Sequence, residues 1–236
     1  PSMAAAIAVG DEVVWIGGYG EQAALDTVYM VGSIEKTFVT TAVMQLAEQG
    51  LLDVTADVNV YLPFEVRNPD YPDVPVTIED LMLHRSGLIG NLPDSLWYDN
   101  DGTALQWAAD NLGTDIRDNP YADRIPPLGE YLAAHFEATA DLWLFEPGTD
   151  WRYSNLGLQQ LLAHIVELVS GQLFGEYVDA NILDPLGMSN AAYEASAFDI
   201  DQLAIPHTKV DGANLAQVLP ADLCAEIDKL LGGSVG

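Results

Sequence analysis

The stretch from Phe38 to Leu46 constrains the fold most, because its apolar residues recur at the spacing of an α-helix. These residues spread around most of the helix circumference: Phe38, Val39, Ala42, Val43 and Leu46. A helix that is apolar nearly all round is buried. Several of its residues are β-branched and form helices poorly, so tertiary packing must hold it together. We therefore expect a buried helix that stops at Gly50.

A serine and a lysine stand at the start of this helix. Ser33 and Lys36 are three residues apart, which places them on one face, one turn from each other. A lysine on a buried helix loses hydration, which disfavours its charged form, and the neutral amine can take a proton from a neighbouring hydroxyl. The positive end of the helix would stabilise an oxyanion there. The other interpretation is structural: Ser33 caps the helix and Lys36 is a solvated charge.

The chain carries a strongly negative charge, with 36 acidic residues against eight Lys and Arg and a formal net charge of −28. Nucleic acid is disfavoured as a partner, because phosphate binding needs clustered basic residues. Anionic membrane surfaces are disfavoured for the same reason. Repulsion among so many carboxylates destabilises a compact fold in dilute salt, whereas 1 M salt screens charges within about 3 Å. We therefore hypothesise that the protein comes from a halophile.

Cys224 is the only cysteine, so the sequence predicts neither a disulfide nor a cysteine-based metal site. The histidines lack the spacing of a zinc motif, and we expect each to be a packing or surface residue: His84, His135, His164 and His207. We expect no metal and no cofactor. No apolar run is long enough to predict a membrane span, and no signal peptide is visible. The strand-like start at Pro1 leads us to expect that an upstream segment is absent.

Local patterns predict further elements. Runs rich in Val, Ile and Trp over 4–9 and 12–16 flank Gly10-Asp11 and predict a β-hairpin, and 28–31 predicts a third strand leading to Ser33. Thr77 begins a capping box before a short helix. Other helices are expected over 103–111, 128–138, 156–169, 173–182 and 221–231. We divide the chain into part of an α/β lobe with the serine helix (1–50), a mainly helical lobe (51–190) and an incomplete return toward the α/β lobe (191–236).

A second polar group, Tyr153-Ser154-Asn155, directly precedes the amphipathic helix expected over 156–169. Taken alone, it predicts an N-cap from Ser154 or Asn155 and a packed tyrosine. If it lies beside Ser33 and Lys36, the same group can also take part in catalysis and substrate binding. A phenol held near an ammonium group can ionise and move a proton, and an amide side chain can hold a substrate carbonyl.

Five motifs, in order, resemble the serine β-lactamase and penicillin-binding-protein superfamily, in the branch of class C β-lactamases, D-Ala-D-Ala carboxypeptidases and family VIII esterases. They cover roughly residues 1–190 and are GSIEKTF (32–38), LHRSGL (83–88), FEPGT (145–149), YSN (153–155) and DPLGM (184–188). The resemblance implies a β-lactamase/transpeptidase-like fold, with an all-α lobe and an α/β lobe whose antiparallel sheet is flanked by helices. It further implies that Ser33 is a nucleophile that forms an acyl-enzyme, that Lys36 and Tyr153 share the work of the general base, and that Asn155 binds substrate.

The family's third motif is a Lys or His followed one residue later by Gly, on a late strand. His207-Thr208-Lys209 is a poor substitute, because it comes soon after Met188 and in a loop-like context. We therefore expect the C-terminal strands and the second oxyanion donor to be missing from this chain, with a second chain as one source of them. Losing one such donor costs on the order of 2.7–4 kcal/mol of transition-state stabilisation.

Two functions stay open at this point. One is a serine hydrolase for a small-molecule, peptide or ester substrate, with esterase or D-amino-acid peptidase activity favoured over true β-lactamase activity. The other is a catalytically inactive sensor or binding domain that uses the same pocket. The intact Ser33, Lys36 and Tyr153 speak against the second function, and the missing third motif speaks for it. An α/β-hydrolase is disfavoured, because no Gly-x-Ser-x-Gly elbow surrounds a serine. The resemblance favours an extracellular or cell-envelope location.

Overall fold

The computed structural model describes residues 2–20, 24, 26–29, 31–92, 126–138, 141–193, 197–198, 204, 207–210 and 213–216. These residues fall into two compact units: one holds those before Ser33 and after Gly187, and the other holds those from Ser33 to Gly187. The helices predicted over 103–111 and 221–231 lie outside the described residues, and the division at residues 50 and 190 stays a prediction.

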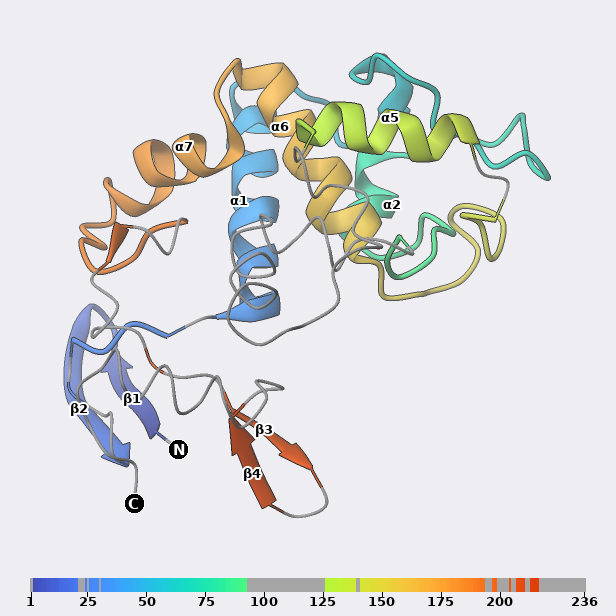
Figure 1. Ribbon diagram of the computed structural model, residues 1–236. Coiled ribbons are helices and arrows are strands. Elements are labelled where there is room, and N and C mark those ends of the chain that lie inside the picture. Colours follow the sequence, from blue (N-terminus) through green and yellow to red (C-terminus); the bar gives the residue numbers. More distant parts are fainter. Residues whose placement is uncertain are drawn as a thin grey trace. The chain divides into compact units, whose positions relative to one another are not determined.

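The first unit contains the predicted hairpin (Figure 1). Strand β1 (Ser2–Val9) pairs antiparallel with β2 (Glu12–Gly20), with one irregularity in register after Ile7. Gly10 takes a φ of +61° in the turn, a backbone conformation that glycine adopts without strain. Strand β2 runs four residues beyond the predicted end, through the glycine-rich segment. The hairpin exposes many large apolar side chains, namely Met3, Ile7, Val9, Val13, Val14, Trp15, Ile16 and Tyr19.

Two strand predictions in this unit are wrong. The residues His207–Val210 form strand β3, which pairs antiparallel with β4 (Ala213–Ala216), so the context of His207-Thr208-Lys209 is a strand and not a loop. The pair Asp211-Gly212, in the sequence between them, is a strong hairpin signal. The described residues of the predicted strand over 28–31 contribute only one bridge, and the carbonyl of Val28 accepts a hydrogen bond of 2.8 Å from Ala204. A β-strand pairs with its neighbour through a ladder of such hydrogen bonds, and a single bond does not form one.

The second unit is built around helix α1 (Glu35–Glu48), which follows a 3₁₀ turn, η1 (Gly32–Ile34). Helix α1 ends where predicted, with Gly50 at a φ of +72°. Its buried residues lie on one side: Lys36, Val39, Ala42, Val43 and Leu46. The opposite side is exposed, and Met44 is 45% exposed, so the prediction of burial all round is wrong.

Three threonines explain why α1 tolerates this exposed side. The hydroxyl of Thr37 donates to the carbonyl of Ile34 at 2.7 Å, and that of Thr41 donates to the carbonyl of Thr37 at 2.7 Å. Thr40 does the same with the carbonyl of Lys36 at 3.0 Å. Such bonds to carbonyls one turn back satisfy a threonine hydroxyl on a helix surface. The β-branched residues therefore do not require burial on that side.

The remaining elements of the second unit agree closely with the sequence pattern. After the short 3₁₀ turn η2 (Val58–Val60), helix α2 (Ile78–Met82) begins at a capping box in which Thr77 and Asp80 bond to each other's backbone N–H groups. Helix α5 (Leu128–Ala138) has the predicted bounds. The long predicted helix is present as a π-helical turn, η3 (Leu156–Leu161), followed by α6 (Leu162–Ser170). The last pieces are α7 (Phe174–Val178) and a second π-helical turn, η4 (Asp179–Leu183).

The core of this unit lies between α1, η3 and α6, which run close together in Figure 1. Val39, Leu161 and Ile165 are fully buried there. Burying one such side chain stabilises the fold by about 1.5–3 kcal/mol. This packing fixes the first turn of α1 against η3, so residues at these two places can act together.

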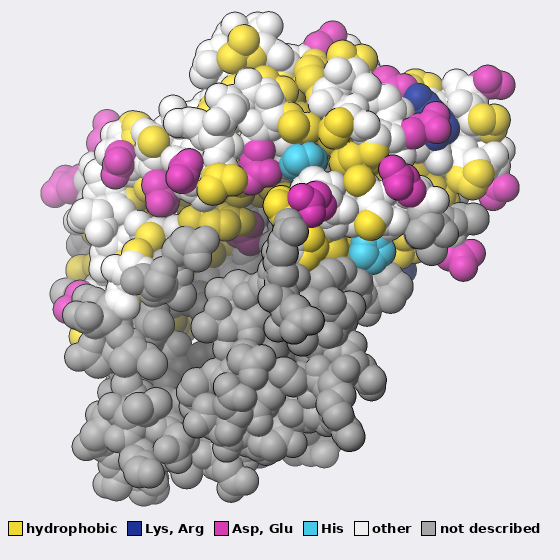
Figure 2. All heavy atoms as spheres, turned by 45° about the horizontal axis from the view of Figure 1, so that its top comes forward, with side chains coloured by type: hydrophobic (Ala, Val, Ile, Leu, Met, Phe, Trp, Pro, Cys, Tyr) yellow, Lys and Arg dark blue, Asp and Glu magenta, His cyan; other side chains and the backbone are white. Residues whose placement is uncertain are grey.

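The described part of the surface shown in Figure 2 is acidic. The face shown in Figure 2 carries Asp and Glu side chains scattered among hydrophobic and neutral ones, and few Lys or Arg. None of the helices in the described part of the chain is both long and apolar enough to cross a membrane.

Candidate active site

Ser33 lies in the 3₁₀ turn η1, between Gly32 and the first residue of α1. The N-cap residue of α1 is Ile34, and no side chain caps the helix. The structural interpretation of Ser33 as the cap is therefore wrong. Its Oγ instead meets two functional groups: the Nζ of Lys36 at 3.3 Å and the hydroxyl of Tyr153 at 2.7 Å.

Lys36 is not a solvated charge, because it is only 8% exposed. Its Nζ donates to the Oγ of Ser33 at 3.3 Å and to the Oε1 of Gln159 at 3.2 Å. The same Nζ lies 5.1 Å from the centre of the Tyr153 ring, within the range of a cation–π contact. The amine is thus held between the serine, the tyrosine and η3.

Tyr153 comes from 120 residues further along the chain and brings its hydroxyl within 2.7 Å of the Ser33 Oγ. Burial by itself would raise the pKa of this phenol. Hydrogen bonds with Lys36 and Ser33, together with the positive charge of Lys36, outweigh burial and lower the pKa of Tyr153 below its usual value. A phenol with a lowered pKa ionises more readily, and the phenolate can accept the serine proton.

His84, in the LHRSGL motif, holds the backbone on both sides of Tyr153. Its Nδ1 accepts a hydrogen bond of 3.1 Å from the N–H of Ser154, and its carbonyl accepts one of 2.9 Å from the N–H of Arg152. The His84 and Tyr153 rings lie 4.6 Å apart. Burial and the charge of Lys36 lower the pKa of His84, which favours the neutral ring whose Nδ1 can accept. His84 has a φ of +57°, a conformation that costs a non-glycine residue about 1–2 kcal/mol.

Ser154 and Asn155 fix the start of η3. The Ser154 Oγ accepts from the N–H of Gly157 at 2.9 Å and donates to the carbonyl of Ile89 at 2.6 Å, so this serine serves as a helix-start cap, as the pattern predicted. The Asn155 Nδ2 donates to the Oδ1 of Asn91 at 2.7 Å. Its own Oδ1 is buried and has no hydrogen-bond partner among the described residues.

The structure therefore brings together three of the four predicted site residues, Ser33, Lys36 and Tyr153. Asn155 follows Tyr153 closely but bonds to Asn91, and within the described residues no hydrogen bond joins it to the other three. Its role toward substrate stays a prediction.

Sequence reasoning missed Gln159, which contacts Lys36, and Glu35, which contacts Gln159. The Gln159 Nε2 donates to the Glu35 Oε2 at 3.0 Å. The sequence predicted an ordinary helix over 156–169, and no local signal marks the π-helical turn that carries Gln159. Glu35 lies inside the serine motif, which was the one available hint.

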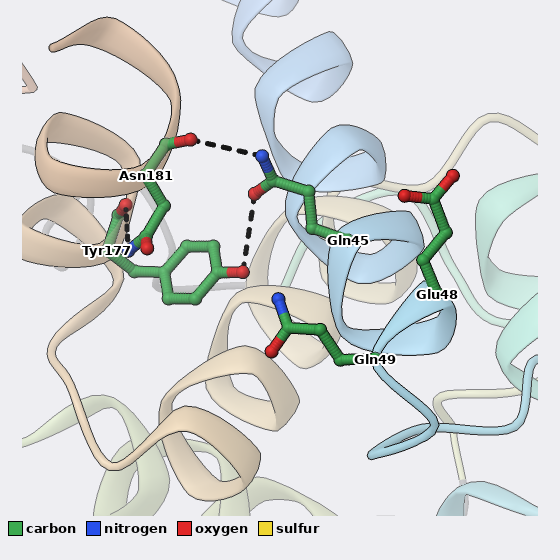
Figure 3. Close-up of a pocket in the computed structure, with 5 residues that line it drawn as sticks. All are labelled: Gln45, Glu48, Gln49, Tyr177 and Asn181. Carbon is green, nitrogen blue, oxygen red and sulfur yellow. Dashed lines mark hydrogen bonds between the residues drawn. The ribbon is translucent and has the colours of Figure 1, made fainter. Parts of the chain in front are cut away.

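A hollow lies on the other half of α1, and its chemistry differs from that of the Ser33, Lys36 and Tyr153 group. Its volume is about 360 Å³, and it is lined by Gln45, Glu48, Gln49, Tyr177 and Asn181 (Figure 3). Gln45 joins the two walls: it accepts from the Tyr177 hydroxyl at 3.3 Å and donates to the carbonyl of Asn181 at 3.0 Å. None of the described residues that line it is a serine, cysteine or lysine, so these residues offer no nucleophile paired with a base. Among the described residues, no group of three or more His, Cys, Asp or Glu is arranged to hold a metal.

The comparisons with known proteins agree with the motifs. The family model described as Beta-lactamase matches residues 1–227. The chain is 31% identical to Esterase EstB of Burkholderia gladioli over 184 residues, which are 77% of this chain and 42% of the esterase. It is 27% identical to Penicillin-binding protein 4* of Bacillus subtilis (strain 168) over 165 residues, 70% of this chain and 30% of that protein. The chain thus spans less than half the length of these relatives.

Solved structures give the same result. An octameric penicillin-binding protein homologue from Pyrococcus abyssi matches with a TM-score of 0.66 and 26% identity, over 92% of this chain and 46% of that one. A D-stereospecific amidohydrolase from Streptomyces sp. matches with a TM-score of 0.53 and 29% identity, over 79% of this chain and 48% of that one. These matches confirm the predicted resemblance and the β-lactamase/transpeptidase-like fold, of which this chain covers a part. The chain belongs to the beta-lactamase family, a family of serine hydrolases.

Proposed function

We propose that this chain carries the acylating centre of a serine hydrolase that acts on ester or amide carbonyls. One observation supports the proposal above all: the Ser33 Oγ lies 2.7 Å from the Tyr153 hydroxyl and 3.3 Å from the Lys36 Nζ. A serine hydroxyl is a weak nucleophile until a neighbouring base takes its proton. Here two candidate bases lie within reach of the same oxygen.

The reaction follows from these positions. Tyr153 begins as the phenolate, which the positive charge of Lys36 stabilises. The Ser33 Oγ forms a bond with the carbonyl carbon while its proton passes to this phenolate oxygen. The carbonyl oxygen becomes an oxyanion, for which the N–H of Ser33 and the positive end of α1 are the available donors. The bond from carbon to the leaving oxygen or nitrogen then breaks, and the leaving group takes the proton from Tyr153. Water later cleaves the acyl-enzyme, with Tyr153 as base, and restores Ser33.

Among possible substrates, we favour an ester or a D-amino-acid amide over a β-lactam. The relatives named above include an esterase and a D-stereospecific amidohydrolase. Both reactions use the same acyl-enzyme chemistry at a serine. Asn155, with its unpartnered Oδ1 among the described residues, is the side chain we propose to bind the acyl part of the substrate.

We further propose that additional polypeptide, from a second chain or from the rest of a longer protein, packs against the β1–β2 hairpin. The second oxyanion donor, which the family resemblance places on a late strand, is a separate contribution that we also expect from such polypeptide. The support is the exposure of the hairpin: Val9 is 66% exposed, Val13 62% and Ile16 53%. Large apolar side chains exposed together on one hairpin are typical of an interaction surface, and the edges of a two-stranded sheet can accept further strands.

The test uses a polypeptide that carries this chain together with the C-terminal strands. The protein is incubated with p-nitrophenyl butyrate and, separately, with a fluorescent penicillin, and the modified residue is located by mass spectrometry. We expect a covalent adduct on Ser33 that is lost in Ser33→Ala and kept in Ser170→Ala, a serine at the end of α6. The absence of both an adduct and turnover would contradict the proposal and favour an inactive sensor or binding domain.

A further inference from the structure

Gln159, outside the Ser33, Lys36 and Tyr153 group, also contacts Lys36, and Glu35 in turn contacts Gln159. The Gln159 Oε1 accepts from the Lys36 Nζ at 3.2 Å, and the Gln159 Nε2 donates to the Glu35 Oε2 at 3.0 Å. A continuous chain of hydrogen bonds therefore runs from Glu35 through Gln159 and Lys36 to Ser33.

The direction of each bond in this chain is determined by chemistry. A carboxylate only accepts and an ammonium group only donates, whereas an amide has one end of each kind. Because Glu35 takes the NH₂ end of Gln159, the amide oxygen must face Lys36. With the amide reversed, its NH₂ group would oppose the ammonium group. Glu35 therefore sets the orientation that makes Gln159 a partner for Lys36.

The backbone gives Gln159 little freedom to move. It lies in the π-helical turn η3, between Leu158, which is 3% exposed, and Leu161, which is fully buried. Turns of this kind are rare and occur frequently at functional sites. Lysine, in contrast, has a flexible four-carbon stem. A fixed acceptor, here the Gln159 Oε1, can therefore hold the Lys36 amine in one place.

We propose that Gln159, oriented by Glu35, is a positioning residue that holds the Lys36 amine within hydrogen-bonding distance of Ser33. The effect on rate rests on the proposed function, whereas the effect on Lys36 itself does not. In the absence of Gln159, Lys36 adopts other side-chain conformations, and its contact with the Ser33 Oγ is lost for part of the time.

The first test is spectroscopic and needs no activity. The chain has only three lysines, Lys36, Lys209 and Lys229, so lysine labelled with ¹³C at Cε gives few NMR signals. The Lys36 signal is assigned by its loss in Lys36→Arg. We expect Gln159→Leu and Glu35→Gln to move this signal and to leave the other two in place. An unmoved Lys36 signal in Gln159→Leu would overturn the proposal.

The second test is a rescue by exchange. Gln159→Glu keeps an acceptor for Lys36 but places two carboxylates against each other, and Glu35→Gln removes the fixed acceptor for the amide. In the double variant Glu35→Gln, Gln159→Glu, an amide NH₂ group at position 35 faces a carboxylate at position 159, so a donor again faces an acceptor. We expect the double variant to return the Lys36 signal toward its wild-type position. A double variant no better than either single variant would contradict the assigned orientation.

The third test is kinetic and depends on the proposed function. With p-nitrophenyl butyrate, Gln159→Leu should lower the rate constant for acylation of Ser33 by about 10–100-fold, since displacing a reacting group by about 1 Å can cost about 100-fold. The KM for the ester should change little, and the double exchange should recover most of the rate. A change in KM alone would contradict a positioning role.

Matched controls exist on α1. Glu48→Gln and Gln49→Leu make the same chemical changes at the other end of the same helix, where both residues are exposed. Neither should alter the Lys36 signal or the acylation rate. If the Lys36 signal responds as expected but the wild type never acylates, the hydrogen bond stands as a structural contact, and both the proposed function and the positioning role in catalysis are overturned.

Discussion

Gly87 allows the LHRSGL segment, which carries His84, to approach the FEPGT segment closely. Its replacement by alanine therefore gives a quantitative prediction. Gly87 lies in the LHRSGL motif with a φ of +81°, and a Cβ added there would lie 2.3 Å from the carbonyl oxygen of Phe145. That oxygen already accepts a hydrogen bond of 3.1 Å from the Nδ2 of Asn68. Asn68 is 1% exposed, so water cannot replace this bond.

The free-energy cost has two parts. A non-glycine residue in the left-handed conformation costs about 1–2 kcal/mol. To relieve the overlap, the Phe145 carbonyl must also move by at least 0.7 Å to reach the 3.0 Å limit that real contacts respect. That movement weakens its bond to Asn68, and a buried polar group left without a partner costs about 1–3 kcal/mol. We expect Gly87→Ala to lower the free energy of unfolding by about 2–5 kcal/mol.

Gly50→Ala is the matched control, because Gly50 also has a positive φ, +72°, but nothing lies within 4 Å of an added Cβ. It should cost only the conformational part, about 1–2 kcal/mol. Urea unfolding followed by tryptophan fluorescence measures both variants at one fixed salt concentration. A loss of stability in Gly87→Ala no larger than that in Gly50→Ala would refute the close-contact reasoning.

Three further predictions follow from the site, the core and the charge. Lys36→Met should shift the rising limb of the pH profile for Ser33 acylation to higher pH, because Lys36 lowers the pKa of Tyr153 and so lets the phenol ionise at lower pH. Lys36→Arg keeps the charge and should shift the limb less. An unmoved limb in Lys36→Met would contradict the role of Lys36 in lowering the pKa of Tyr153. Gly129→Ala should lower the melting temperature, because its Cβ would lie 2.6 Å from the buried ring of His164; an unchanged melting temperature would show that the ring can move aside. Our proposal of a salt-rich origin predicts a higher melting midpoint in molar KCl than in dilute buffer, given a net charge of −28, and equal midpoints would contradict it.

Much of the local structure was predictable because its causes are local. The capping box at Thr77 and the hairpin turn at Gly10 each depend on a few neighbouring residues, and both are present. Ser33 and Lys36 could be paired from their spacing alone. Tyr153 could not: only the family resemblance connected it with a serine 120 residues earlier.

The misses have non-local causes. The exposed side of α1 depends on what packs against the helix, and the threonines that tolerate exposure also read as β-branched residues that require burial. The strand predicted over 28–31 required a partner that sequence alone does not identify. Gln159 was missed because a π-helical turn shifts the direction of its side chain relative to an ordinary helix, and the sequence carries no clear signal for that shift.

The most direct test of the central claim is the rate constant for acylation of Ser33 in Tyr153→Phe, which removes only the hydroxyl that lies 2.7 Å from the Ser33 Oγ. Tyr71→Phe is the control, because Tyr71 is 37% exposed, much like Tyr153 at 38%. A general base contributes about 10²–10⁴-fold to such a step. The account predicts a loss of that size in Tyr153→Phe and none in Tyr71→Phe. Acylation of Ser33 at the wild-type rate in Tyr153→Phe would contradict it.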